Sequence, residues 1–169
     1  NIDSPAQAVR LGIGMVHQHF MLVEAMTVFE NIILGDKTAK GVFINKEARK
    51  KDIVALSDRY GLKVELDKQI SEISVGAQQR IEIVKALYRG AELLVLDEPT
   101  AALTDIEVEG LFDVLCKLRE ENKSVIFISH KMREVLRISD RITILRAGQT
   151  IKTLDCCSTT SEELASLMI

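Results

Sequence analysis

Two short runs of apolar residues constrain the fold more than any other feature of the chain. Residues 93–97 (LLVLD) and 125–129 (VIFIS) are almost continuously apolar, and each ends in a polar residue. Such runs are typical of strands that are covered on both faces in a parallel sheet. Segments with helical spacing lie between and around them. We therefore predict an α/β fold in which right-handed crossovers join the strands of a layered parallel sheet.

Capping residues and periodicity predict the other elements. Asn45, Ser74 and a capping box of Thr104 with Glu107 each mark the start of a helix. Val108, Leu111, Leu115 and Leu118 form the buried stripe of the helix after Thr104. The helices capped by Asn45 and Ser74 should span residues 46–60 and 75–89. Further helices are expected at residues 5–10 and 131–138, and further strands at 14–18, 141–145 and 149–154.

The distribution of these elements predicts the domain organisation. Residues 20–89 have few strand signals and should be mostly helical. We expect an α/β core made of residues 1–19 and 90–157, an inserted helical subdomain at residues 20–89, and a C-terminal helix at residues 158–169.

Composition excludes several classes of protein. The net charge is −3 and the sequence pI is about 5.7, so no positive field attracts nucleic acid or anionic lipid. The longest apolar runs have four or five residues, far fewer than a membrane span needs. Three cysteines, two of them adjacent, do not form a disulfide framework, and no signal-peptide pattern is present. We expect a cytoplasmic location and no direct insertion into lipid.

Polar residues at the ends of the two apolar strands are candidates for chemistry. Asp97 and Glu98 follow the first strand at the edge where open α/β sheets bind ligands. One carboxylate could hold a hydrated divalent cation while the other polarises a nucleophilic water. The alternative is a pair of solvated or helix-capping acids. His130 follows the second strand and could donate a hydrogen bond to a phosphate oxygen.

The end of the predicted strand at residues 14–18 adds a neutral amide. Gln18 could order a water molecule or reach a metal, although an ordinary loop amide is the simpler interpretation. His17 and His19 flank it, and we interpret them as core or surface residues rather than metal ligands.

Four segments together resemble one family, the ATP-binding subunits of ABC transporters. They are MVHQ for the Q-loop, ISVGAQQR for the signature segment, ELLVLDEPT for the Walker B strand and its glutamate, and ISHK for the switch histidine. Their order and spacing also fit, and they cover nearly the whole chain. The resemblance implies the core of a P-loop NTPase of the ABC type.

The resemblance also implies roles for individual residues, with ATP and Mg²⁺ as cofactors. Asp97 would hold the magnesium ion through water, and Glu98 would be the general base for the attacking water. His130 would be the second catalytic residue and would contact the γ-phosphate. Gln18 would sense the nucleotide, reach the metal and couple the site to the membrane subunits.

A second nucleotide-binding domain is a further partner that the resemblance implies. Ser74 and Gly76 would present a hydroxyl group, backbone N–H groups and the positive end of a helix to the γ-phosphate bound by that domain. Val75 and Ala77 replace the usual glycine and glutamine of this signature. At the D-loop the usual aspartate position holds Thr104, so Asp105 is assigned no role.

The segments SVGAQQR, VHQHFMLV, TVFENIILG and EPTAALT resemble the simple-sugar and nucleoside importer branch. This implies transmembrane permease subunits as partners and a peripheral location on the cytoplasmic face of the cell membrane. Docking would run through the helical segment around residues 20–35. The transported solute is chosen by other subunits in this family, so the sequence does not identify it.

One part of the family pattern is missing from the sequence. None of the nine glycines precedes a lysine, so the phosphate loop G-x-x-x-x-G-K-S/T is absent. We therefore expect a fragment that lacks the amino-terminal part with the Walker A strand. Alone, it should show negligible ATP turnover. Exposed strand edges should then pair with another copy of the chain.

Two other functions remain as alternatives. A non-transport ABC protein that acts on DNA or ribosomes would need a long coiled-coil insertion or a basic stripe, and the sequence indicates neither. A non-catalytic interaction module is the other alternative, in which the signature helix only completes the site of another domain. The changes at Val75 and Ala77 keep this second alternative open.

Overall fold

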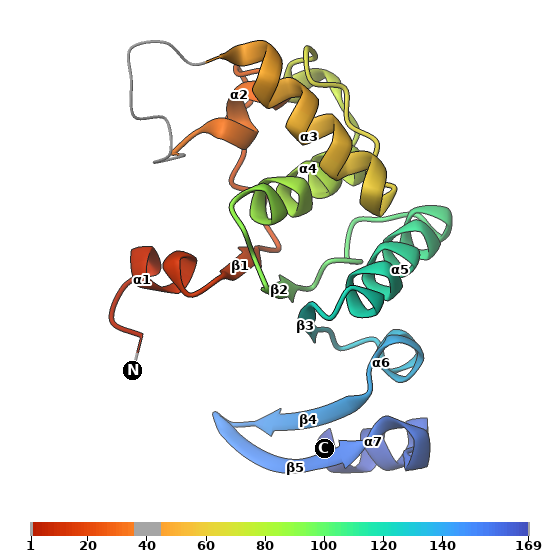
Figure 1. The fold of residues 1–169 in the computed structure, drawn as a ribbon. Coiled ribbons are helices and arrows are strands. Elements are labelled where there is room, and N and C mark those ends of the chain that lie inside the picture. Colours follow the sequence, from red (N-terminus) through yellow and green to blue (C-terminus); the bar gives the residue numbers. More distant parts are fainter. Residues whose placement is uncertain (1, 36–44, 169) are drawn as a thin grey trace. The chain divides into compact units, whose positions relative to one another are not determined.

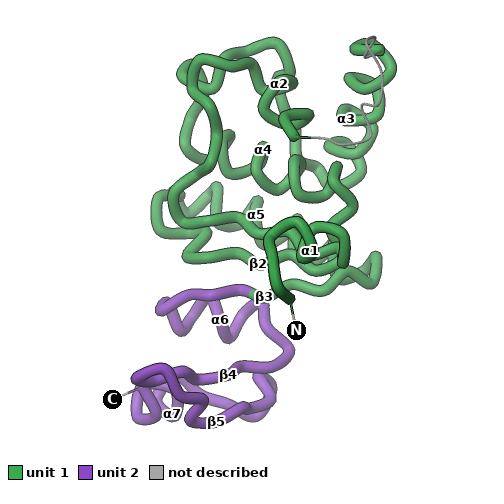
Figure 2. Tube along the Cα trace, turned by 90° about the vertical axis from the view of Figure 1, so that its left-hand side faces the viewer, with its two compact units in different colours: residues 1–126 green, residues 127–169 purple. Residues whose placement is uncertain are grey.

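The computed structural model describes residues 2–35 and 45–168, which form both helices and strands (Figure 1). The chain consists of two compact units, Asn1–Ile126 and Phe127–Ile169 (Figure 2). Within the described residues, no helix combines the length and the apolar character that a membrane span requires.

The first unit contains the sheet that the apolar runs predict. Its strands are β1 (Ile13–Val16), β2 (Leu93–Asp97) and β3 (Ser124–Ile128), in the order β1-β2-β3, and the boundary between the units falls within β3. β1 and β2 run parallel, with Val16 opposite Leu96. The parallel α/β fold is therefore confirmed.

The predicted end of the first strand was wrong. β1 stops at Val16, so Gln18 lies two residues beyond the strand and not at its last position. Strand β1 also packs closely against the helix that contains Ala86. A Cβ atom at Gly14 would lie 2.9 Å from the Cβ of Ala91 and 3.0 Å from that of Ala86, which is too close for any larger residue. Gly14 thus allows β1 to approach the helix that ends near Ala86.

The helices of the first unit begin where their capping residues indicate. They are α1 (Pro5–Arg10), α2 (Val28–Ile33), α3 (Lys46–Tyr60), α4 (Val75–Tyr88) and α5 (Asp105–Glu120), with a 3₁₀ turn at Ile70–Glu72. Ser74 caps α4, and Thr104 with Glu107 forms the predicted capping box of α5. Among the described residues between 20 and 89, the regular elements are helical, as predicted. The division into core and helical subdomain stays a prediction.

Helix α4 is the centre of the first unit. Its residues from Ile81 to Leu87 are all buried, and the helix packs against α2, α3 and β1. The helix is surrounded, because these elements cover it on several sides. Any polar side chain in its middle must therefore find a partner inside the protein.

The second unit is a hairpin with two helices. It comprises α6 (Met132–Ile138), β4 (Arg141–Arg146), β5 (Gln149–Asp155), a 3₁₀ turn at Cys156–Ser158, and α7 (Ser161–Met168). β4 and β5 are antiparallel, and the turn residues Ala147 and Gly148 both have positive φ, as a two-residue hairpin turn requires. Ile142, Ile144 and Leu164 form the core of this unit. The C-terminal helix starts at Ser161, three residues later than predicted, because the 3₁₀ turn precedes it.

Candidate functional site

The parallel pairing of β1 and β2 brings polar residues to one edge of the sheet. Val16 lies opposite Leu96, so the two strands end side by side. Asp97 is the last residue of β2, Glu98 follows it, and Gln18 comes two residues after β1. The side chain of Gln18 is exposed, whereas Asp97 and Glu98 are half-buried. The structure thus places these three predicted residues at the same carboxyl edge, where α/β sheets bind ligands.

The backbone at Glu98 is in an unusual conformation. Its φ is +46°, in the left-handed region that costs a residue with a side chain about 1 kcal/mol or more. Pro99 and Thr100, which follow, are buried, so the loop is held in place by packing. One carboxylate oxygen of Glu98, Oε2, is shielded from solvent. Strained residues of this kind concentrate at functional sites, where the fold holds a side chain in one direction.

The first turn of α4 carries the two predicted signature residues. Ser74 is exposed, and its Oγ accepts a hydrogen bond from the Ala77 N–H at 3.3 Å. Gly76 is buried. A Cβ atom at Gly76 would lie 2.6 Å from the carboxyl carbon of Glu107, closer than real atoms pack. The glycine therefore has a structural role within this chain that sequence reasoning did not identify.

Glu107 links the start of α5 to the start of α4. Its Oε2 accepts hydrogen bonds from the Thr104 N–H at 3.0 Å and from the Thr104 Oγ1 at 2.9 Å. The backbone bond first, and then the hydroxyl bond, hold the pKa of Glu107 below its usual value. The carboxylate is therefore ionised at neutral pH. It lies against the amino-terminal turn of α4, where the helix dipole stabilises a negative charge.

Three buried polar side chains in the middle of α4 also reach the loops of the site. Gln79 Nε2 donates to the carbonyl of Pro99 at 2.6 Å. Glu82 and Lys85 bind the backbone of Met21, three residues after Gln18. Sequence reasoning missed all three, because it predicted this helix only from its cap and its periodicity. Their spacing of three residues within a largely apolar helix was the available signal.

Comparison with known proteins identifies the fold. The model of the ABC transporter family matches residues 2–101, which is more than half of the chain. The chain belongs to the ABC transporter family. This confirms the resemblance found in the four sequence segments.

Similar proteins extend the match along the whole of this ABC chain. It is 54% identical to the nucleoside import ATP-binding protein NupA of Lactococcus lactis subsp. cremoris, and 50% identical to the guanosine import ATP-binding protein NupO of Bacillus subtilis. Both alignments cover 100% of this chain and 33% of the relative. The chain therefore spans about one third of the length of these relatives.

A solved structure supports the same fold. The dimeric bacterial ABC transporter cassette MJ0796 is 25% identical and superposes with a TM-score of 0.75. The match covers 91% of this chain and 68% of the cassette. The predicted class, an ABC-type ATPase fold with a parallel sheet, is thereby confirmed.

His130 belongs to the second unit of this ABC chain. It is exposed and follows β3, and the hydroxyl of the preceding Ser129 accepts a hydrogen bond from the Lys131 N–H at 3.1 Å. That bond turns the chain from the strand towards α6. The role of His130 as a γ-phosphate ligand stays a prediction.

Proposed function

We propose that this chain is part of the ATP-binding subunit of an ABC importer, in which ATP binding and hydrolysis drive solute uptake. One observation carries the proposal more than any other. The parallel pair β1–β2 places Gln18, Asp97 and Glu98 at one carboxyl edge, and Glu98 is held there in a strained conformation. A carboxylate fixed in this way suits a general base, which must be oriented before the reaction.

The residues at this edge have the chemistry that ATP and Mg²⁺ need. Mg²⁺ prefers oxygen ligands and keeps several waters, so a carboxylate and an amide oxygen at one edge of the sheet are suitable donor types. Asp97 would hold the ion through water, and Gln18 would add its amide oxygen. The bound ion would neutralise charge on the phosphates. Glu98 would orient the attacking water and accept its proton on a carboxylate oxygen. His130 would donate a hydrogen bond to the γ-phosphate.

The first turn of α4 supports a role for a second nucleotide-binding domain. Ser74 is exposed at the end of a helix of 14 residues, so its hydroxyl is accessible to another molecule. We assign Ser74 and Gly76 to the γ-phosphate held by that second domain. Gly76 would contribute through its backbone N–H, since glycine has no side chain.

The names of the relatives suggest the solute. NupA and NupO are named as nucleoside and guanosine import proteins, so we propose nucleosides as the solute class, with simple sugars as the other candidate. The other partners would be permease subunits that hold the chain at the cytoplasmic face of the membrane. The net charge of −3 gives no reason to expect nucleic acid or direct lipid binding.

Phosphate release after a single substitution tests the proposal. The protein to use is this chain fused to an amino-terminal segment that carries a phosphate loop, G-x-x-x-x-G-K-S/T, because that loop is not within these residues. We expect ATP hydrolysis by this fusion, and a loss of about 100-fold or more in Glu98→Gln with ATP binding retained.

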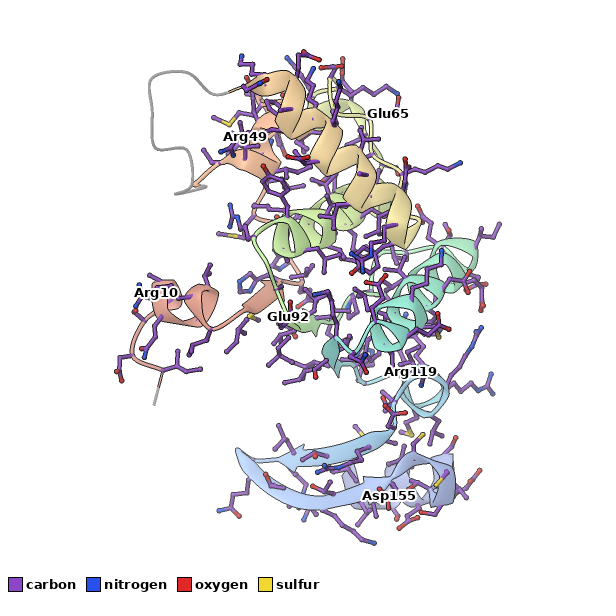
Figure 3. The ribbon with its side chains drawn as sticks, viewed as in Figure 1. Arg10, Arg49, Glu65, Glu92, Arg119 and Asp155 are labelled. Carbon is purple, nitrogen blue, oxygen red and sulfur yellow. The ribbon has the colours of Figure 1, made fainter. Side chains whose placement is uncertain are left out.

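The matched control is Glu92→Gln, a carboxylate just before β2, at the opposite end of the strand from Glu98; it is labelled in Figure 3. It should change hydrolysis less than twofold. Equal activity in wild type and Glu98→Gln would contradict the proposal. ATP binding without hydrolysis by the wild-type fusion would favour a non-catalytic interaction module instead.

A further inference from the structure

Three polar side chains of α4 are buried. Gln79, Glu82 and Lys85 are only 3%, 6% and 8% exposed. Gln79 and Glu82 are neighbours on the helix surface, as are Glu82 and Lys85, because each pair is three residues apart. Gln79 and Lys85 lie about 120° apart around the helix axis, so the three side chains face different loops. Figure 3 shows the side chains of α4 amid those of the surrounding elements. Burying polar groups is costly unless each one is bonded, so the partners of these three side chains show what the row is for.

Glu82 and Lys85 together bind the backbone of Met21. Glu82 Oε1 accepts from the Met21 N–H at 3.0 Å, and Lys85 Nζ donates to the Met21 carbonyl at 3.3 Å. The two charged groups also contact each other, with 3.5 Å between Lys85 Nζ and Glu82 Oε1. The Met21 side chain itself is 69% exposed. The contact therefore fixes the course of the backbone just after Gln18 and does not depend on which side chain stands there.

Gln79 binds the backbone next to Glu98. Its Nε2 donates to the Pro99 carbonyl at 2.6 Å, in the interior of the protein. The residue before a proline is restricted in conformation, and Glu98 precedes Pro99 with a φ of +46°. Holding the proline carbonyl therefore limits how the Glu98 backbone can rotate.

We propose that Gln79, Glu82 and Lys85 are positioning residues that hold the Gln18 loop and the Glu98 loop in one fixed relation. All three side chains extend from the same helix, whose first turn also carries Ser74 and Gly76. A movement of either loop relative to α4 must break buried polar contacts, so the two loops move together with the helix. The functional part of this inference rests on the proposed role of Gln18 and Glu98 in ATP hydrolysis. The mechanical part does not.

Hydrogen–deuterium exchange tests the mechanical part on the same fusion protein, without nucleotide. One reporter is the Met21 amide, which is bonded to Glu82, and the other is the Ala101 amide, which donates to the Glu98 carbonyl at 3.2 Å. Lys85→Met should raise exchange about tenfold in peptides containing Met21 and at least threefold in those containing Ala101. Gln79→Met keeps the side-chain volume but removes the hydrogen-bond donor. It should raise exchange more in peptides containing Ala101 than in those containing Met21.

Two further variants keep this test decisive. Lys68→Met removes the lysine of an exposed ion pair with Glu65 and should leave both loops unchanged. Lys85→Arg retains a cation and hydrogen-bond donors, so it should keep most of the protection from exchange at both loops. This variant can be measured even if Lys85→Met is too unstable to study. The inference is overturned if each substitution loosens only the loop that it touches, or if Lys68→Met has the same effect.

Kinetics test the functional part. Gln79→Met should lower kcat for ATP hydrolysis at least tenfold and change the KM for ATP less than twofold, because the residue acts through the orientation of Glu98. Lys85→Arg should have at least half of the wild-type kcat. Coupled exchange in a fusion that never hydrolyses ATP would reject the proposed function and leave the mechanical inference standing. Normal hydrolysis with independent exchange in the two loops would reject the inference alone.

Discussion

Helices α4 and α5 are similar in length but use their polar residues in opposite ways. On α5 the buried residues are apolar, and side-chain hydrogen bonds secure its two ends, where Thr104 donates to Glu107 and Tyr60 donates to Glu121. On α4 polar residues are buried in the middle and bind the backbone of two loops. Helix α5 is therefore a packing element with capped ends. Helix α4 instead holds other segments in position, so substitutions in its middle should have wider effects.

The largest expected difference between the helices concerns their lysines. Lys85→Met leaves Glu82 buried without its cation, so we expect the free energy of unfolding to fall by about 3 kcal/mol. Lys117 is exposed on α5, and Lys117→Met should change the free energy of unfolding by less than about 0.5 kcal/mol. Urea denaturation followed by circular dichroism measures both. Similar values for the two variants would remove the distinction between the helices.

The polar contact at the end of α5 should have an intermediate effect. Tyr60 donates to Glu121 Oε2 at 2.5 Å, and Tyr60→Phe should cost about 1 to 3 kcal/mol, as for a hydrogen bond to a charged group.

This contact also predicts a dependence on pH. Burial first, and then the bond to Glu121, raise the pKa of Tyr60 to about 12. The folded state thus holds this proton more tightly than the unfolded state does. The contribution is complete below pH 10 and is lost as the pH rises from 10 to 12. In Tyr60→Phe this part of the pH dependence should disappear, and an unchanged alkaline profile would contradict the assignment.

The two helical glycines offer a smaller but closely matched comparison. At Gly110 on α5 an added Cβ has no neighbour within 4 Å, so Gly110→Ala should stabilise the chain by about 0.5 to 1 kcal/mol. At Gly76 on α4 the added atom overlaps the Glu107 carboxylate, so Gly76→Ala should destabilise it by about 1 kcal/mol. Thermal unfolding of both variants gives the sign. In a Glu107→Ala background Gly76→Ala should become stabilising, and failure of this reversal would show that the overlap is not the cause.

The smallest expected effect is the acid dependence of the Glu107 contact. The pKa of Glu107 is lowered in the folded chain, chiefly by the backbone N–H of Thr104. Its contribution to stability is therefore present above pH 4.5 and is lost as the pH falls further, through the lowered folded-state pKa. The difference in unfolding free energy between wild type and Glu107→Gln should shrink over this range. Glu30→Gln, in the equivalent capping box of α2, should show the same acid dependence. The pKa of Glu30 is lowered by the corresponding contacts, first with the backbone and then with the side chain of Thr27.

Much of the fold followed from local signals in the sequence. Capping residues such as Ser74 and Thr104 marked helix starts correctly, because their hydrogen bonds involve residues three positions away. The apolar run at residues 93–97 marked a buried strand for a similar local reason. The end of β1 was misplaced, because a strand ends where its partner stops pairing, and that depends on a segment nearly 80 residues away.

In the candidate site, too, some residues were predictable from local sequence and others were not. Asp97 and Glu98 were identifiable because they end a buried strand, and Gln18 because it follows another. The sequence did not identify the polar row of Gln79, Glu82 and Lys85. The residues next to them in the chain do not indicate which loops they bind. Gly76 was assigned to a phosphate on the basis of the sequence. Its close approach to Glu107 was not predicted, because Glu107 lies 31 positions later in the chain.

The sequence by itself determined the fold class, the helix starts, the family and the two carboxylates at the end of β2. These depend on periodicity, on capping hydrogen bonds and on motif order, all of which act over short distances along the chain. Only the tertiary structure decided that α4 is covered on several sides, that its polar row binds two loops, and that Glu98 adopts a positive φ. The physical reason is that burial and strain are properties of packing. A polar side chain becomes a positioning residue only when distant segments close around it.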